Sequence, residues 1–150
     1  MPIIRSVFSL ILVLVTVLLV SCGSPQATEP TTYSAEQIEE IQSFLEPVLV
    51  SRERMKELES LINDENWIDT DNLIHGPLGS LRRNLRYLSD NLLPEDQKRA
   101  KQLSKELFAD IERIDVAAKN QNYSAAVQQY TQTIRDFDTL LDLIPTSEDT

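Results

Sequence analysis

The chain contains one cysteine, one histidine and three glycines among its 150 residues. One cysteine cannot form an intramolecular disulfide framework or a cysteine-based zinc site. None of Gly23, Gly76 and Gly79 belongs to a glycine-rich loop of the kind that binds phosphate groups. Basic residues are also few, with 14 Lys and Arg against 24 Asp and Glu. Because nucleic-acid binding requires a basic field, this balance argues against a nucleic-acid partner.

The first 21 residues have the pattern of a secretory signal. Arg5 supplies a positive charge, and residues 7–20 are apolar apart from two hydroxyl side chains. A helix of these 14 residues reaches only about 21 Å, which is shorter than the ~30 Å core of a bilayer. The sequence LVSC at positions 19–22 resembles the bacterial lipobox, in which the cysteine is acylated and the signal is cut just before it. We therefore expect lipidation at Cys22, with a plain secreted protein as the alternative.

Removal of residues 1–21 leaves 129 residues, which suffice for one domain with one core. Residues 22–33 contain two prolines and several small polar residues, and we expect them to form a flexible tether of roughly 20 Å. The mature chain has a net charge of −11, because the signal contains one basic residue and no acidic residue. This charge favours solubility and a basic or metal-rich partner surface. At the other end, residues 146–150 are expected to fray.

Residues 34–145 predict helices throughout, because apolar residues recur at steps of three and four. The first helix is expected from Ser34 to Ile62, and Ser34 with Gln37 fits a capping box. Pro47 lies inside this helix and removes a backbone donor, so we expect a kink near residues 43–47. The predicted inward stripe is Ile38, Ile41, Leu45, Val48, Arg52, Met55, Leu58 and Ile62.

The second helical unit, Trp67 to Leu93, has two interpretations. Gly76 and Pro77 fit the N-cap and first residue of a helix that begins there. The interpretation that we favour is a longer helix, capped by Asp69, that continues through Pro77 with a kink. In both cases a regular leucine stripe points inward: Leu78, Leu81, Leu85, Leu88 and Leu92.

The third and fourth helices are separated by a polar turn at residues 120–122. The third is expected at about 95–119 after a tight turn at Pro94, and the fourth at 123–143 with Asn122 as its N-cap. The inward residues of the third are expected to be Leu103, Leu107, Ile111, Ile114 and Ala118. Those of the fourth are expected to be Tyr123, Val127, Tyr130, Ile134, Phe137, Leu141 and Ile144. Four helices with short connections predict an all-α, up-down-up-down antiparallel four-helix bundle.

The sequence NLIHGPLGSLRRNLRYLSDNLLP at positions 72–94 is the most specific stretch of the chain. Together with the lipobox, Trp67 and the ending DFDTLLDLIP, it resembles the PsbQ-like family of cyanobacterial photosystem II subunits, over nearly the whole chain. The resemblance implies a four-helix bundle on the lumenal face of the thylakoid membrane. It implies binding to the photosystem II core near the manganese-calcium cluster, beside other extrinsic subunits. It also implies support of water oxidation without catalysis, and calcium-ion binding as a family attribute.

Nothing in the sequence predicts an enzyme or a bound cofactor. His75 lacks the histidine or cysteine companions of a zinc site. It is expected to be a polar residue near a helix kink, although adventitious metal pickup with Asp69 and Asp71 is an alternative. Haem ligation by Met55 and His75 is disfavoured, because a methionine in an apolar stripe usually fills a core and no CxxCH motif is present.

Acidic residues such as Asp110 and Glu112, or Asp136 and Asp138, lie two positions apart. They therefore point to different helix faces and do not form a paired acid–base site. Two functions remain beside a photosystem II subunit: an envelope lipoprotein adaptor or chaperone, and an electron-transfer or metal-binding bundle. Co-purification with oxygen-evolving complexes tests the first of these alternatives, and a visible absorption spectrum tests the second.

One segment departs from the acidic character of the chain. Between positions 82 and 105, seven basic residues outnumber three acidic ones, which gives a charge of +4 against −15 for the rest of the mature chain. Helical spacing gathers these residues on the second and third helices, on both sides of the turn at Pro94. We predict a docking patch for an acidic partner surface, with an ordinary solvated face as the alternative. This basic hairpin consists of Arg82, Arg83, Arg86, Lys98, Arg99, Lys101 and Lys105.

Overall fold

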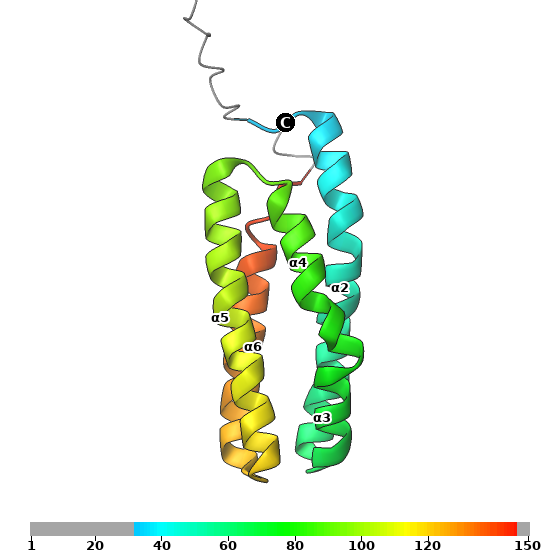
Figure 1. Ribbon diagram of the computed structural model, residues 1–150, viewed down its shortest axis with the longest axis vertical. Helices are drawn as coiled ribbons and strands as arrows, with labels where there is room; N and C mark the ends of the chain where they lie inside the picture. Colours follow the sequence, from blue (N-terminus) through cyan, green and yellow to red (C-terminus); the bar gives the residue numbers. More distant parts are fainter. Residues whose placement is uncertain (1–31, 147–150) are drawn as a thin grey trace, which may run out of the picture.

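The computed structural model describes residues 32–146, which form a bundle of four antiparallel columns (Figure 1). The predicted all-α, up-down-up-down fold is therefore confirmed. The signal, Cys22, most of the tether and the end of the tail lie outside the described residues. None of the helices in this range is long and apolar enough to span a bilayer. The elements, in chain order, are α2 (Ala35–Asn63), α3 (Trp67–His75), the 3₁₀ helix η1 (Pro77–Ser80), α4 (Leu81–Asp90), α5 (Pro94–Lys119) and α6 (Tyr123–Leu141).

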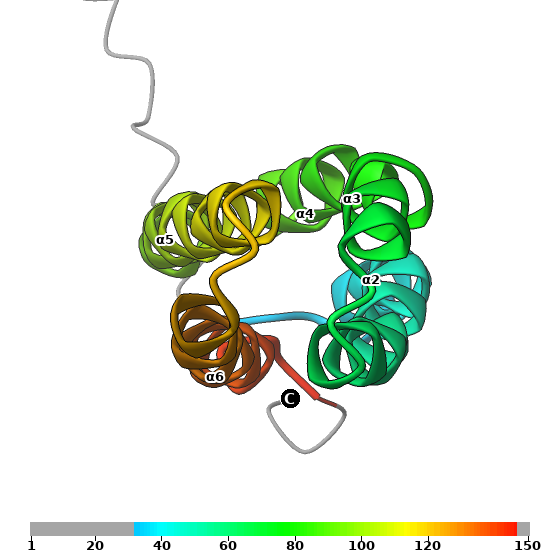
Figure 2. The same ribbon diagram turned by 90° about the horizontal axis from the view of Figure 1, so that it is seen from below.

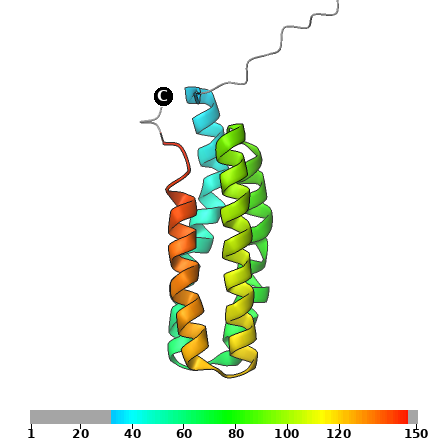
Figure 3. The same cartoon turned by 90° about the vertical axis from the view of Figure 1, so that its left-hand side faces the viewer.

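The second column is built from three successive elements, α3, η1 and α4 (Figure 1). Viewed along the axis, each column lies beside the columns that precede and follow it in the sequence, and α6 closes the ring beside α2 (Figure 2). The start of α2, the α4–α5 turn and the end of α6 lie at one end of the bundle (Figures 1 and 3). The opposite end carries the α2–α3 and α5–α6 turns (Figure 1).

The start of α2 follows the predicted cap. The Ser34 side chain accepts a hydrogen bond from the Gln37 N–H at 3.2 Å, and the Gln37 side chain accepts one from the Ser34 N–H at 2.9 Å. This reciprocal arrangement satisfies two of the free donors at the helix start, and it confirms the capping box. Helical structure continues through Pro47, where the expected kink stays a prediction.

The favoured interpretation of the second column, a single kinked helix capped by Asp69, is wrong. Asn66 is the N-cap of α3, and its side chain accepts from the Asp69 N–H at 3.3 Å. The α-helix ends at His75, because Gly76 adopts φ −96 and ψ −97 and Pro77 has no N–H to continue the hydrogen bonding. The 3₁₀ turn η1 follows with Pro77 as its first residue, as in the alternative interpretation.

The core is mostly aliphatic and runs the length of the bundle. The predicted stripes of α2 and α4 face this core, although Leu45 and Arg52 are only half-buried. In α5, Leu103 is half-buried and Ala100 and Ala117 complete the inward face. The largest fully buried side chains are Phe137, Ile41, Met55, Leu58, Ile62, Leu81, Leu85, Leu88, Leu107, Ile114, Leu140 and Val48.

The predicted inward face of α6 is partly wrong. Tyr123 is 43% exposed, and Val127, Ile134 and Leu141 are half-buried at the flanks. The sequence pattern selected large apolar residues, whereas the buried line of α6 includes an alanine and a threonine that carry no clear hydropathy signal. That line is Ala126, Tyr130, Thr133, Phe137 and Leu140. Asn122 caps this helix as predicted, since its side chain accepts from the Ala125 N–H.

The predicted tether extends one residue too far, because Tyr33 belongs to the bundle. Its hydroxyl donates to Asp96 Oδ2 at 2.8 Å and accepts from the Leu93 N–H at 3.0 Å. Burial, together with the neighbouring Asp96 carboxylate, raises the pKa of Tyr33 to about 12, against a smaller lowering by the Leu93 N–H. The segment that precedes α2 is thus fastened to the α4–α5 turn.

Candidate docking surface

The basic hairpin lies on the adjacent antiparallel helices α4 and α5, but two of its seven members are already engaged. Arg82 Nη2 lies 3.3 Å from Glu112 Oε1, and the Arg82 guanidinium stacks 4.1 Å from the centre of the Phe108 ring. Lys101 Nζ lies 2.9 Å from Asp90 Oδ1. These two cations connect α4 with α5, so their charge is partly compensated within the bundle.

The other five cations have no acidic partner among residues 32–146. They divide into two groups by helix. The α4 group is Arg83 and Arg86, and the α5 group is Lys98, Arg99 and Lys105. Lys98 and Arg99 border a groove that reaches Thr139 of α6, on the side of α5 away from α4. The structure therefore brings the predicted patch to one hairpin without placing all of it on one face.

Aromatic side chains accompany the α4 group. The Arg86 guanidinium lies 5.1 Å from the centre of the Tyr87 ring, within range of a cation–π interaction. Tyr87 is 43% exposed, and its ring lies 6.4 Å from that of Phe44 on α2. The exposed side of α4 thus combines uncompensated arginines with an accessible aromatic ring.

A recess of about 240 Å³ opens where the second column breaks. Its floor consists of the buried side chains Ile74, Leu78 and Ile111, with Phe108 beside them. Gly79 also lines it, and a Cβ at Gly79 would meet nothing within 4 Å. The exposed side chains at its edge are His75, Arg82 and Glu112.

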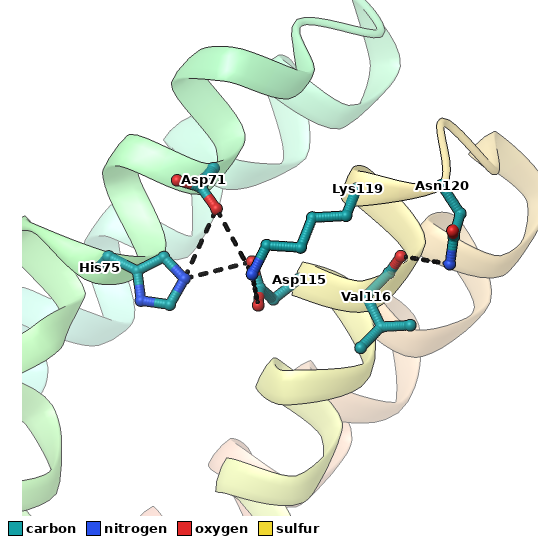
Figure 4. A network of polar contacts seen from close by, with 6 residues as sticks. All are labelled: Asp71, His75, Asp115, Val116, Lys119 and Asn120. Carbon is teal, nitrogen blue, oxygen red and sulfur yellow. Dashed lines mark hydrogen bonds and ion pairs between the residues drawn. The ribbon is translucent and has the colours of Figure 1, made fainter.

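His75 takes part in an ion-pair network that joins α3 to α5 (Figure 4). His75 Nε2 lies 3.5 Å from Asp71 Oδ1 and 3.2 Å from Asp115 Oδ1. Lys119 Nζ donates to Asp115 Oδ2 at 2.6 Å and lies 3.8 Å from Asp71 Oδ1. Burial alone would raise the pKa of Asp115, but the hydrogen bonds from Lys119 and His75 lower it below the usual value.

The ligand atoms of Asp71, His75 and Asp115 lie within 4.8 Å of one another, a spacing that a metal ion can use. Lys119 already supplies a positive charge at this place, as the dashed contacts of Figure 4 show. From the sequence, Asp69 is a candidate metal-binding companion of His75. Its carboxylate instead accepts hydrogen bonds from the side chains of Asn66 and Asn72. Met55 lies fully buried in the core, whereas His75 is exposed.

A second polar cluster lies between α5 and α6. Asp110 is 3% exposed and accepts a hydrogen bond from Arg113. Burial and the neighbouring Asp136 carboxyl raise the pKa of Asp110 to about 6, against the opposing effect of Arg113. The adjacent polar hollow of about 460 Å³ is lined by Asp110, Arg113, Gln128, Gln129, Thr131, Gln132 and Arg135.

Comparison with known proteins agrees with this architecture. The chain matches the PsbQ family, oxygen evolving enhancer protein 3, over residues 4–145. It belongs to the PsbQ family. It is also 54% identical over 142 residues to CyanoQ of Synechocystis sp. strain PCC 6803, covering 94% of this chain and 95% of that protein. The PsbQ-family chain is a non-catalytic extrinsic subunit of the oxygen-evolving complex of photosystem II.

Two contacts of this PsbQ-family chain were missed in the sequence. Asp110 on α5 lies beside Asp136 on α6. From the sequence, each was compared only with an acidic residue two positions away. The available signal was the position of Asp110 between Leu107, Ile111 and Ile114, where an acid stands among inward-facing residues. Asp115 as a partner of His75 left no comparable signal, because 40 residues separate them.

Proposed function

We propose that this PsbQ-family chain is a lipid-anchored subunit on the lumenal face of the thylakoid membrane. There it binds the photosystem II core beside other extrinsic subunits and supports water oxidation without catalysing it. The observation that carries the proposal is the family match, which covers residues 4–145. The identity with CyanoQ extends over 94% of the chain, so the correspondence includes all four columns of the bundle.

The anchor in this proposal is Cys22. Its support is the sequence LVSC at positions 19–22, which stands at the end of an apolar stretch too short to span a bilayer. Acyl chains contribute about 0.8 kcal/mol for each buried CH₂, and stable anchoring needs at least two membrane signals. Two or three long acyl chains on one cysteine meet this requirement.

Docking in this proposal uses the basic hairpin. Five of its cations have no acidic partner among residues 32–146. They stand out because the mature chain outside the segment 82–105 carries a charge of −15. Such a field orients the protein toward an acidic surface and raises the association rate, with a dependence on salt. Because exposed charges contribute little to folding, the bundle should tolerate their replacement.

Co-purification tests the proposal directly. The full-length chain, tagged at its C-terminus, is expressed in a cyanobacterial strain that lacks its own copy, and oxygen-evolving photosystem II is isolated. We expect the chain to co-purify with the complex. The variant Arg83→Glu, Arg86→Glu, Lys98→Glu, which changes only cations without an acidic partner among residues 32–146, should rebind less to depleted photosystem II membranes, with the largest difference at low salt. A chain recovered only with other envelope proteins would instead indicate an adaptor or chaperone.

A further inference from the structure

We propose that photosystem II is contacted by the α4 side of the basic hairpin and not by the α5 group. The partner is inferred to be an acidic protein surface that inserts one apolar side chain into the recess at the break of the second column. This inference rests on the proposed function and specifies the surface that performs it.

The charges of the α4 side are arranged for a protein partner. Arg83 and Arg86 lie three residues apart on one helix, and neither has an acidic partner among the described residues. A guanidinium binds a carboxylate through two parallel hydrogen bonds, which an ammonium cannot do. Arginine and tyrosine are enriched in protein interfaces and at their energetic centres, whereas lysine is depleted there. The α5 group consists of two lysines and Arg99.

The aromatic contacts hold part of this surface in place before binding. Arg86 stacks on Tyr87 at 5.1 Å, and Tyr87 in turn lies 6.4 Å from Phe44 of α2. Side chains that are already ordered lose less conformational entropy when a partner binds. Tyr87 remains 43% exposed, so it can contribute apolar area to an interface.

The recess continues this surface toward the break. Arg82 lines the recess and shares a helix face with Arg86, four residues later. Ile74, Leu78 and Ile111 make the floor apolar, while Glu112 compensates the charge of Arg82 at the edge. The complementary partner group is therefore an apolar side chain, with carboxylates placed to meet Arg83 and Arg86.

The α5 group faces a different region. Lys98 and Arg99 border the groove that includes Leu103 and Thr139, between α5 and α6. A partner that covers the α4 side and the recess thus has no need to contact them. This separation permits a test in which the same number of charges is reversed on either side.

The first experiment compares Arg83→Glu, Arg86→Glu with Lys98→Glu, Arg99→Glu. Each variant changes the net charge of the full-length chain by four units, so both alter its overall field equally. Each is expressed in the strain without its own copy, and the amount retained on isolated photosystem II is measured. We expect retention to fall roughly tenfold or more for the α4 variant and less than about twofold for the α5 variant.

The second experiment adds bulk at the wall of the recess without changing charge. Gly79→Leu adds a side chain where a Cβ meets no neighbouring atom, and Gly79→Ala is the matched control. We expect Gly79→Leu to lower retention several-fold and Gly79→Ala to leave it unchanged. Circular dichroism and thermal melting of every variant identify any loss that comes from misfolding, and a misfolded Gly79→Leu is replaced by Gly79→Gln.

The outcomes separate this inference from the proposed function. Selective loss with the α4 and recess variants supports the inference. Equal losses with both charge variants would show that only the overall field matters, and would overturn it. Full retention of all variants would also overturn it and leave association with photosystem II intact. Failure of the unmodified chain to co-purify would instead contradict the proposed function itself.

Discussion

Among single residues, Asp110 has a strongly perturbed environment, with a pKa of about 6 instead of 3.8. Below about pH 3 the carboxyl is protonated in both the folded and unfolded chain, and it adds no penalty. As the pH rises toward 6, the unfolded chain releases this proton first, so folding stability falls and then stays lower. The elevated pKa therefore predicts a cost at neutral pH on the order of 2–3 kcal/mol.

Asp110→Asn should remove this pH dependence, because the amide has a shape similar to that of the protonated carboxyl and does not ionise in this pH range. Chemical denaturation between pH 4 and 7.5 should show the variant gaining stability relative to the unmodified chain as the pH rises. Asp142→Asn, at an exposed position, serves as the control and should keep the original profile. A parallel pair of curves for Asp110→Asn and the unmodified chain would contradict the elevated pKa.

Packing makes a second prediction for single residues. Leu85 is 1% exposed, so Leu85→Ala leaves a cavity in the core and should cost about 2–5 kcal/mol of unfolding free energy. Ile134 lies at the flank of α6, and Ile134→Ala should cost clearly less, on the order of 1 kcal/mol. Denaturant titrations of the two variants measure this difference. Equal costs would mean that Ile134 is part of the central core.

Among the helices, the sequence predicts some features better than others for physical reasons. Capping depends on neighbouring residues such as Ser34 and Gln37, so the start of α2 was correctly predicted. The break at Gly76 depends on a backbone conformation that proline in the next position permits but does not require. The inward face of α6 depends on close packing, which selects Ala126 and Thr133 over larger apolar residues.

The break between α3 and η1 predicts an asymmetry between two glycines. A Cβ at Gly76 would lie 2.7 Å from the backbone oxygen of Asn72, which cannot move without distorting α3. Gly76→Ala should therefore destabilise the bundle by about 1–3 kcal/mol, whereas Gly79→Ala should change stability by no more than about 0.5 kcal/mol. Thermal melting of both variants tests the comparison. A neutral Gly76→Ala would mean that the break tolerates another backbone conformation.

For the whole molecule, local charge in the sequence is enough to propose a docking surface on the second and third helices. It does not show that the free cations of this surface divide into an α4 group and an α5 group. Helical spacing gathers basic residues on α4 and α5 whatever their contacts. Which cations remain free depends on the register between helices, as in the pairing of Arg82 with Glu112 thirty residues away. The same reason explains why Asp115 was not foreseen as the partner of His75.

Attachment of the whole molecule is tested at Cys22. Cys22→Ser removes the acylated thiol, so the chain should appear in the soluble fraction or accumulate as an uncut precursor. Fractionation of membranes with and without detergent, followed by mass analysis of the N-terminus, measures the result. Persistence of a mature chain that requires detergent for extraction would contradict lipidation at this residue.

The hydroxyl of Tyr33 has a mechanical consequence. The hydroxyl donates a hydrogen bond to Asp96 and accepts one from the Leu93 N–H. The chain at residue 33 is therefore attached to the α4–α5 turn as well as to the first turn of α2. A pull on the preceding segment is therefore shared between α2 and the α4–α5 turn, and does not act on the end of one helix alone. The bundle should resist peeling from its N-terminal end, and Tyr33→Phe should lower the force at which α2 begins to unravel.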